Sequence, residues 1–457
     1  MIRFNNFDIG QIRGNGFNFK QMKLNGNFLF NLQYELQESD ILSSIDIDFT
    51  HQIEIAQVYD KYLLVVDGTD KKIYLLKLEN DSLRIIETTE FDSITFSGYS
   101  IFANKNSRYF VLKANSSYYV QAKVYAFKIT EDDTIEPITL KVSTGIKILF
   151  SENGKILTQY SGTSIYVYNI ENELTYIGKL SISKIDNYFL NISKSGKYIF
   201  WHGLDSEETS YFNLYRTDTL ERIPVSGSSS NTIEYACFSN DENKIAVIYT
   251  NSACYTYLIN IDEETNTAEK ANDIQLFNGS GLYFENVTFS EDDSYLGITI
   301  NPDTSSNNYL CIINTKTLKL TRTKFSAYIY LLDGLKEYLM TSGSASCGLY
   351  SYDVNKNLST KKYTFSKGMK PYRKKLYETY AYNLKKLSIV DNLMISHSYG
   401  SSTQSYIYKN EELIKTFTHN NSVDYFYYTI IKIGNYYFIN QPWAKSGCVY
   451  CLKNARV

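Results

Sequence analysis

Apolar and polar residues alternate along most of this chain, in short stretches separated by polar turns. A clear copy of the pattern runs from Ile148 to Leu180 and reads ILFSENGKILTQYSGTSIYVYNIENELTYIGKL. An apolar stretch ends at Phe150-Ser151, a polar turn follows, and three further stretches come after it. Alternation with a period of two is typical of β-strands, and Asn, Asp and Gly favour chain reversal. Each copy therefore predicts four short antiparallel strands.

The same pattern returns at a regular interval. Clear copies begin again at Leu190, Ala236 and Val287, and looser ones extend the series in both directions. The interval is about 42 to 55 residues, in the range of four-stranded propeller blades. The second strands are predicted to start near Tyr62, Tyr109, Lys155, Lys197, Lys244, Tyr295, Tyr338, Leu393 and Tyr436.

This repeat predicts an all-β fold, a single β-propeller of about eight four-stranded blades, with seven to nine allowed. Radial closure explains how so many strands avoid exposed edges. The last repeat, Tyr425 to Leu452, supplies about three strands, so we expect an N-terminal strand to complete the last blade. Phe17 to Leu24 and Asn27 to Leu36 are the candidates. Residues 1–40 are thus expected to complete the last blade or form a docking arm, and residues 41–457 to form the propeller.

Two turns carry a resemblance to known propellers. Ser151-Glu-Asn-Gly-Lys155 and Ser193-Lys-Ser-Gly-Lys197 join the first and second strands of two clear copies. In these turns and the strands around them the chain resembles the WD40 and YVTN-type β-propellers, over most of its length. The Gly-His and Trp-Asp signatures of WD40 blades are absent. The resemblance therefore implies the propeller architecture with degenerate repeats.

Composition agrees with an all-β protein. The chain of 457 residues has 43 Tyr and only 5 Pro, and tyrosine favours strands while proline interrupts their ladders. A net charge of −3 argues against a surface built wholly for nucleic acid or anionic lipid. The abundance of Asn, Lys, Ile, Tyr and Phe suggests an AT-rich genome, such as that of a low-GC bacterium or one of its viruses.

The chain shows no export or membrane signal. Residues 1–20 lack the apolar core of a secretory peptide, and no run of 18 apolar residues occurs. We therefore expect synthesis and folding in a cytoplasm, incorporation into a virion or other large particle, and no membrane insertion. The six cysteines are expected to be reduced thiols.

No catalytic, metal or cofactor site is expected. His202 and His397 lie at equivalent strand ends and could approach one face, but they form no metal-binding pair. The pair Cys448 and Cys451 lies in a predicted strand, where residues three apart point to opposite faces.

Acidic loops could supply the hard oxygen ligands that calcium prefers. These loops hold Asp303 in one case and Glu291-Asp292-Asp293 in another. Their spacing matches no calcium motif, so we interpret them as solvated turns.

One basic segment, residues 356–386, stands out and coincides with the longest repeat interval. It has ten Lys and Arg residues, one opposing Glu378 and five interleaved tyrosines. This mixture fits a solvated inter-blade insertion, a dock for an acidic protein surface, or a site for nucleic acid or another polyanion. The candidate binding residues are Lys367, Lys370, Tyr372, Arg373, Lys374 and Lys375.

The sequence thus predicts a non-catalytic interaction or structural propeller. We expect its partners to be other proteins of a bacterial or bacteriophage assembly, such as a tail, baseplate or host-attachment part. The alternative is a lectin-like propeller that binds carbohydrate, including cell-surface carbohydrate, or another ligand, because tyrosine suits both protein and sugar recognition. A propeller enzyme and a nucleic-acid-binding protein are the lesser alternatives.

Overall fold

Each stretch that the sequence marks as a strand pairs with the next one along the chain. In the computed structural model, β15 (Lys147–Phe150) pairs antiparallel with β16 (Ile156–Ser161). β16 then pairs with β17 (Ser164–Asn169), and β17 with β18 (Thr175–Ser181). Short turns join these strands, so local contacts set the register. This four-stranded meander is the repeating unit of the molecule.

The structure describes residues 53–59, 61–67, 71–79, 82–90, 100–114, 121–182, 190–203, 212–226, 233–250, 253–278, 282–302, 308–331, 334–342, 346–365, 430–434 and 436–441. It also describes residues 3–4, 7–8, 19–24, 27–32, 41–42, 389–390, 393–397, 404–409, 412–418 and 448–453, all of which lie in strands.

The sheets in the first half of the chain consist of β6 (Ile53–Val58), β7 (Tyr62–Asp67), β8 (Lys72–Glu79) and β9 (Ser82–Glu90); β10 (Ser100–Ala103), β11 (Tyr109–Lys113), β12 (Ala122–Ile129) and β13 (Ile135–Ile138) with β14 (Thr144–Gly145); β15 to β18; β19 (Leu190–Ile192), β20 (Tyr198–His202), β21 (Phe212–Arg216) and β22 (Arg222–Ile223); and β24 (Ile233–Phe238), β25 (Lys244–Thr250), β26 (Cys254–Asp262) and β27 (Thr267–Lys270) with β23 (Val225–Ser226) and β28 (Ile274–Phe277).

The remaining sheets consist of β29 (Leu282–Phe289), β30 (Tyr295–Pro302), β31 (Asn308–Asn314) and β32 (Leu320–Phe325); β33 (Tyr328–Leu331), β34 (Glu337–Ser342), β35 (Ser346–Asp353) and β36 (Leu358–Phe365); β37 (Ile389–Val390), β38 (Leu393–His397), β39 (Gln404–Lys409) and β40 (Glu412–Thr418); and β41 (Ile430–Ile433), β42 (Tyr436–Gln441) and β43 (Cys448–Lys453) with β5 (Ile41–Leu42). Two separate pairs are β1 (Arg3–Phe4) with β2 (Phe7–Asp8) and β3 (Phe19–Leu24) with β4 (Asn27–Leu32).

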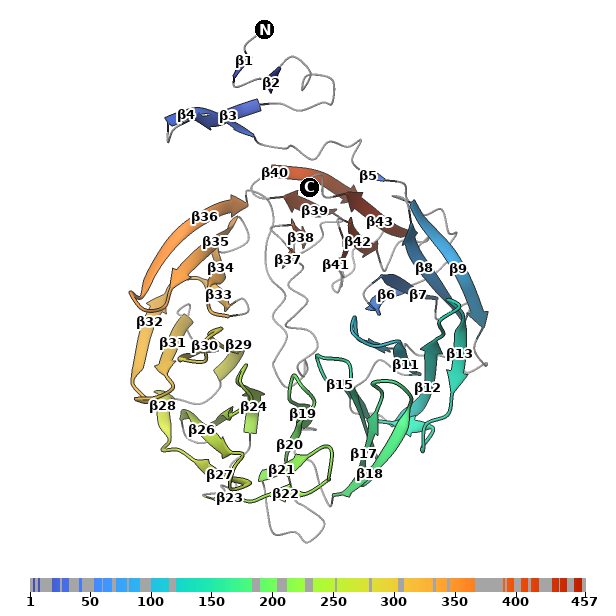
Figure 1. Ribbon diagram of the computed structural model, residues 1–457. Coiled ribbons are helices and arrows are strands. Elements are labelled where there is room, and N and C mark those ends of the chain that lie inside the picture. The colour runs from blue at the N-terminus through green and yellow to red at the C-terminus, as the bar shows by residue number, and fades with distance from the viewer. Residues whose placement is uncertain are drawn as a thin grey trace.

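These sheets follow one another around a ring, in chain order (Figure 1). The first strand of each sheet lies nearest the centre and the last strand lies at the rim. The described residues contain no helix. The predicted all-β propeller is confirmed. The described residues form nine sheets of four or more strands, and the number of about eight blades stays a prediction.

The second strands begin where the sequence pattern placed them. Each of the nine predicted positions lies within one residue of the first residue of a strand. These strands are β7, β11, β16, β20, β25, β30, β34, β38 and β42. The polar turn before each one is therefore a reliable marker of the repeat.

A strand from the N-terminal part closes the ring, as expected. β5 pairs antiparallel with β43, with Leu42 opposite Cys451 and Ile41 opposite Leu452. The two candidate segments do not fill this place, because they pair with each other as β3 and β4. Asn25-Gly26 separates them, the pair that two-residue hairpin loops prefer, and this local signal explains the hairpin. The closing strand comes later in the chain than expected.

The core lies between neighbouring sheets. In β25, Ile245, Val247 and Tyr249 pack in one apolar cluster with the sheet β19–β22. Ala246 and Ile248 pack in another cluster, with the sheet β29–β32. Successive side chains of a strand point to opposite faces, so one strand contributes to two cores. This explains why β7, β16 and β20 are buried at every residue.

Closure by β5 predicts where the chain can be shortened. A chain that starts at Ser43 is expected to lose about 1 to 3 kcal/mol of unfolding free energy relative to one that starts at Ile41. The loss follows because β5 contributes backbone hydrogen bonds of about 1 kcal/mol each. Urea unfolding followed by tryptophan fluorescence measures the difference. Equal stability of the two chains would show that β5 does not close the ring.

Candidate interaction face

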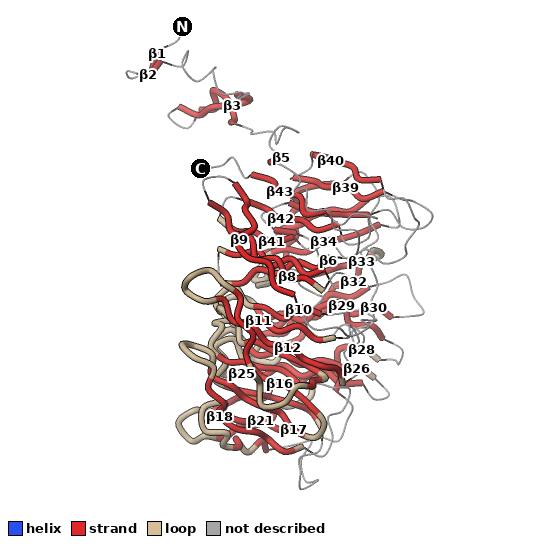
Figure 2. The backbone as a smooth tube through the Cα atoms, turned by 90° about the vertical axis from the view of Figure 1, so that its right-hand side faces the viewer, coloured by secondary structure: helices blue, strands red, loops and turns tan. Residues whose placement is uncertain are grey.

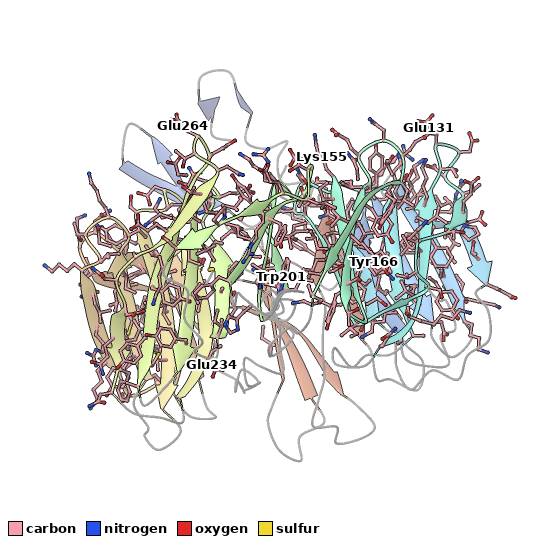
Figure 3. The ribbon with its side chains drawn as sticks, turned by 90° about the horizontal axis from the view of Figure 1, so that it is seen from below. Glu131, Lys155, Tyr166, Trp201, Glu234 and Glu264 are labelled. Carbon is pink, nitrogen blue, oxygen red and sulfur yellow. The ribbon has the colours of Figure 1, made fainter. Side chains whose placement is uncertain are left out.

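Two kinds of turn share one face of the ring. One kind joins the first and second strands of a sheet, and the other joins the third and fourth strands. Figure 3 places Lys155, from the first kind, at the same face as Glu131 and Glu264, from the second kind. Glu234 lies at the opposite face. We call the face with these turns the turn face; its turns are drawn as tan loops along one side of the molecule in Figure 2.

A buried serine shapes the turn before the second strand. In four turns, the backbone N–H of the first residue of the second strand donates to this serine Oγ, at 2.9 to 3.1 Å. The serine main chain also pairs with the same segment, so the turn is closed on both sides. The Phe-Ser or Ile-Ser ending seen in the sequence is thus a turn cap. The four serines are Ser151, Ser193, Ser239 and Ser290.

Hydrogen bonds join each of these turns to the turn of the next sheet. Asn104 Nδ2 donates to the Ser151 carbonyl at 2.7 Å, and Asn106 Nδ2 donates to the Glu152 carbonyl at 2.8 Å. In the following turn, Asn153 Nδ2 donates to the Ser195 carbonyl at 2.6 Å. A side-chain amide in one turn therefore reaches the main chain of the next.

The chain of bonds continues through carboxylates in the later sheets. Ser195 donates to the Glu242 carboxylate through both its N–H and its Oγ. Asn240 N and Asp241 N donate to the two oxygens of Asp293, at 2.8 and 2.7 Å. Charge-assisted bonds of this kind are stronger than neutral ones. Glu242 and Asp293 are both buried, at 8% and 7% exposure, so their carboxylates stabilise the contacts between turns.

The first and last turns of this series are also linked to their neighbours. Tyr59 N donates to the carbonyl oxygens of Asn104 and Ser107, at 3.3 and 3.1 Å. At the other end, Ser290 forms a parallel bridge with Gly334. The bonds therefore link seven consecutive sheets, from β6–β9 to β33–β36. We call this series the turn belt.

Two glycines allow the turns to approach each other. Gly154 and Gly196 have φ of +74° and +78°. A Cβ on Gly154 would lie 2.7 Å from the Asn106 carbonyl carbon and oxygen. Only glycine fits such a close backbone contact in the left-handed region without strain.

The turns between third and fourth strands carry their own caps. Asp262, Asn314 and Asp353 each accept two backbone N–H bonds through Oδ1, at 2.8 to 3.3 Å. Five of these turns also have a residue with positive φ, namely Asp133, Leu220, Asn266, Leu318 and Asn357. Asx caps and left-handed residues fix short turns of this kind.

Asp133 ties two sheets together through charge. Its carboxylate accepts hydrogen bonds from the Tyr62 hydroxyl and, at 2.6 Å, from Lys77 Nζ of the preceding sheet. Burial opposes the charge of Asp133, but the bonds from Lys77 and Tyr62 outweigh it and hold its pKa below the ordinary value. Burial and this carboxylate raise the pKa of Tyr62 to about 12.

A pocket of about 260 Å³ opens on the turn face between the sheets β29–β32 and β33–β36. Three asparagines, two tyrosines, two threonines and Lys319 line it, over a floor that includes Ile312 and Val354. Tyr295 Oη donates to Asn355 Oδ1 at 3.1 Å across the two sheets. None of its lining residues carries a carboxylate.

The basic segment proposed from the sequence is described only in part. Lys367, Lys370, Tyr372, Arg373, Lys374 and Lys375 lie outside the described residues. At its start, Lys356 pairs with Asp353 at 3.1 Å, and Lys362 of β36 pairs with Glu337. The role of the segment in binding stays a prediction.

The other residues weighed for chemistry lie in strands and turns. His202 is the last residue of β20 and is buried, and His397 is the last residue of β38. Cys448 and Cys451 both lie in β43. Among the described residues, no three His, Cys, Asp or Glu side chains gather as a metal site would require.

The acidic turn is solvated only in part: Glu291 and Asp292 are exposed, whereas Asp293 is buried, so the interpretation as a solvated turn is wrong for Asp293. Asp292 Oδ1 accepts from Ser290 Oγ at 2.6 Å and from Ser294 N at 3.1 Å, while Asp293 belongs to the turn belt. Asp303 lies outside the described residues.

Two buried lysines near the ring interior were not singled out from the sequence. Lys147 of β15 donates from Nζ to the Leu190 carbonyl of β19 at 2.7 Å, and so joins two inner strands. Burial lowers the pKa of Lys147 to about 7 and that of Lys113 to about 8. A lysine in an alternating strand suggests solvent exposure, and only the packing of the next sheet reveals burial.

No protein-family model and no curated protein matches this sequence. Among solved structures, Saccharomyces cerevisiae Sqt1 is 10% identical with a TM-score of 0.47, over 90% of this chain and 98% of that chain. The C-terminal WD40 domain of Sif2 is 8% identical with a TM-score of 0.46, over 89% and 97%. A putative 6-phosphogluconolactonase from Bacteroides uniformis is 12% identical with a TM-score of 0.40, over 68% and 98%. These similarities concern the fold alone.

Within the described residues, no helix is long and apolar enough to cross a membrane.

The close approach of the turns predicts the effect of adding one methyl group. Gly154→Ala is expected to lower the unfolding free energy by about 2 to 4 kcal/mol, from the left-handed backbone and the clash with Asn106. Gly162→Ala is the matched control, because Gly162 has φ +59° but nothing within 4 Å of its Cβ position. It is expected to cost only about 1 kcal/mol. Equal losses in urea unfolding would contradict the role of Gly154 in the belt.

The Asp133 cluster predicts a pH dependence. A carboxyl whose pKa is lower in the folded state stabilises the fold above its unfolded pKa, about 3.9, and this stabilisation is lost as pH falls through the folded pKa. The unfolding free energy of the wild type is therefore expected to exceed that of Asp133→Asn by about 1 kcal/mol at pH 6. This difference in unfolding free energy should shrink below about pH 4, because Asp133 becomes protonated there.

Asp132→Asn serves as the control for that series, since Asp132 is exposed beside the cluster. Urea unfolding from pH 6 to pH 2 measures all three proteins. A gap between wild type and Asp133→Asn that stays constant with pH would disprove the linkage.

Proposed function

We propose that this chain is a non-catalytic interaction propeller whose turn face docks other proteins. The turn belt carries this proposal, because it fixes the main chain of seven successive turns on one face. A face that is ordered before binding loses less conformational entropy when a partner docks. Function often lies in loops held by a rigid scaffold, and this face has that form.

The charges on one part of the turn face support a basic partner surface. In the sheets from β10–β13 to β24–β27, the turns between third and fourth strands expose Glu131, Asp132, Glu173 and Glu264. The nearby Glu171 and Glu263 are already paired with Lys155 and Lys197. Complementary charge speeds association and selects partners more than it adds affinity.

We further propose that the partners belong to a bacterial or bacteriophage assembly, such as a tail, baseplate or host-attachment part. The AT-rich residue composition supports this finer proposal. Sedimentation of lysate particles tests it: the chain should travel with a large particle at fixed stoichiometry. A chain that always stays in the soluble fraction would count against it.

The inter-sheet pocket favours a second candidate, a lectin-like propeller that binds carbohydrate or another small ligand. Its lining combines tyrosine rings with amide and hydroxyl groups, which suit polar ligands with several oxygens. Glycan-array binding by the purified chain distinguishes this candidate from the first.

Charge reversal on the two faces tests the docking proposal. In affinity purification from native lysate, the chain is expected to retain a stoichiometric set of proteins identified by mass spectrometry. The double variant Glu131→Lys with Glu264→Lys should reduce that set about tenfold or more, since like charges across an interface repel. Glu234→Lys, on the opposite face, should retain it.

Two outcomes would reject the proposal. One is a monomer that retains no protein from the lysate. The other is equal retention by the turn-face and control variants, with thermal melting showing that both are folded.

A further inference from the structure

We propose that the pocket between β29–β32 and β33–β36 binds a small ligand through an oxyanion group, a phosphate or a carboxylate. The pocket is smaller than the usual range of drug-sized sites, about 300 to 1,000 Å³, so it suits one charged group with a small attached body. The proposal goes beyond protein docking and does not depend on it. It names the ligand chemistry of the second candidate function.

The amide groups of the pocket are oriented by the protein itself. Asn314 Oδ1 accepts from the backbone N–H of Lys316 and Thr317, at 3.1 and 2.8 Å. Backbone N–H groups can only donate, so the Asn314 oxygen faces the turn and its Nδ2 remains a donor. The orientation of this amide is therefore set before any ligand binds.

The other two asparagines turn their oxygens towards tyrosine hydroxyls. The Tyr295 hydroxyl donates to Asn355 Oδ1 at 3.1 Å, and the Tyr352 hydroxyl donates to Asn357 Oδ1 at 2.8 Å. Within the described part of the chain, neither Nδ2 has a hydrogen-bond acceptor. Each amide keeps two N–H donors, so the three asparagines together offer a group of donors.

Lys319 gives the pocket its charge. It is exposed, lines the pocket, and forms no ion pair with any described residue. With amide donors, one ammonium and no carboxylate, the lining favours a ligand that brings acceptor oxygens and negative charge. A neutral sugar would leave the charge of Lys319 unmatched.

Equivalent places between other sheets show why the pocket is open here. Five second strands begin with a tyrosine, and the residue opposite it differs. It is Lys77 for Tyr62, Arg216 for Tyr198 and Asn314 for Tyr295, and it is a lysine for Tyr109 and Tyr436. At the first place Lys77 pairs with Asp133 of the next sheet.

The second place is filled in a similar way. Lys197 pairs with Glu263 of the next sheet, and Arg216 pairs with Asp218 at 2.9 Å. At Tyr295 the corresponding side chains are short and neutral, so no ion pair fills the space. The pocket is therefore the place where an internal ion pair is replaced by donors that a ligand can use.

Calorimetric titration of the full chain tests the proposal with three probes. Ribose 5-phosphate carries a phosphate, glucuronate carries a carboxylate, and glucose is neutral. At least one anionic probe is expected to bind with Kd below about 1 mM, and glucose at least about tenfold more weakly. The stronger anionic probe then tells which oxyanion the pocket prefers.

Variants then locate the binding. Lys319→Gln is expected to raise the Kd of the anionic probe about tenfold or more, because it removes a charge-assisted bond. Asn357→Gly should also weaken binding, and glycine accepts the φ of +50° found there. Lys316→Gln is the matched control, an exposed lysine of the same turn that does not line the pocket. It should leave the Kd unchanged.

Several outcomes would overturn the proposal. They are the absence of binding of both anionic probes up to about 10 mM, glucose binding as tightly as they do, or equal affinity of Lys319→Gln and wild type. Thermal melting of each variant shows that it is folded. If both anionic probes fail to bind and a neutral glycan binds at another place, this pocket is rejected while the lectin-like candidate stands.

Discussion

The turn belt is the constraint that the rest of the architecture depends on. Apolar packing between sheets has no direction, and alone it would allow neighbouring sheets to slide or tilt. The belt adds directional bonds, such as Asn104 to Ser151 and Asn153 to Ser195, at one end of the six interfaces between the seven sheets that it links. It therefore fixes the height of each of these sheets relative to the next. A closed ring needs this, because errors between sheets would accumulate until β5 and β43 could not meet.

The belt uses two chemical solutions for one position. In two turns a glycine with positive φ lets the main chain approach the neighbouring turn. In two others, Glu242 and Asp293 hold the same kind of backbone conformation, and their carboxylates reach back to the preceding turn. A missing side chain permits contact in the first solution, and a charged side chain makes it in the second. This explains why Glu242 and Asp293 are buried in these turns.

The interfaces between sheets also differ in the side chains that fill their ends at the turn face. Ion pairs occupy two of them, Lys77 with Asp133 and Lys197 with Glu263. Asn314 and Asn355 stand at a third, where the pocket opens. A repeat protein keeps its core pattern in every unit and varies the polar ends. Specific recognition is therefore expected at these ends, on the turn face, and not in the apolar layers.

The sequence by itself determined the all-β class, the repeat and the start of every second strand, because period-two alternation and polar turns are local signals. It also indicated that an N-terminal strand completes the last sheet. The candidates within residues 17–36 were wrong, because Asn25-Gly26 favours a hairpin there and β5 closes the ring instead. The turn partners, the burial of Lys147 and the pocket beside Tyr295 were decided only by the tertiary structure. Each depends on residues from two sheets that lie about 40 to 60 positions apart. Alternation shows which way a side chain points within its own sheet, but not what the next sheet places opposite it.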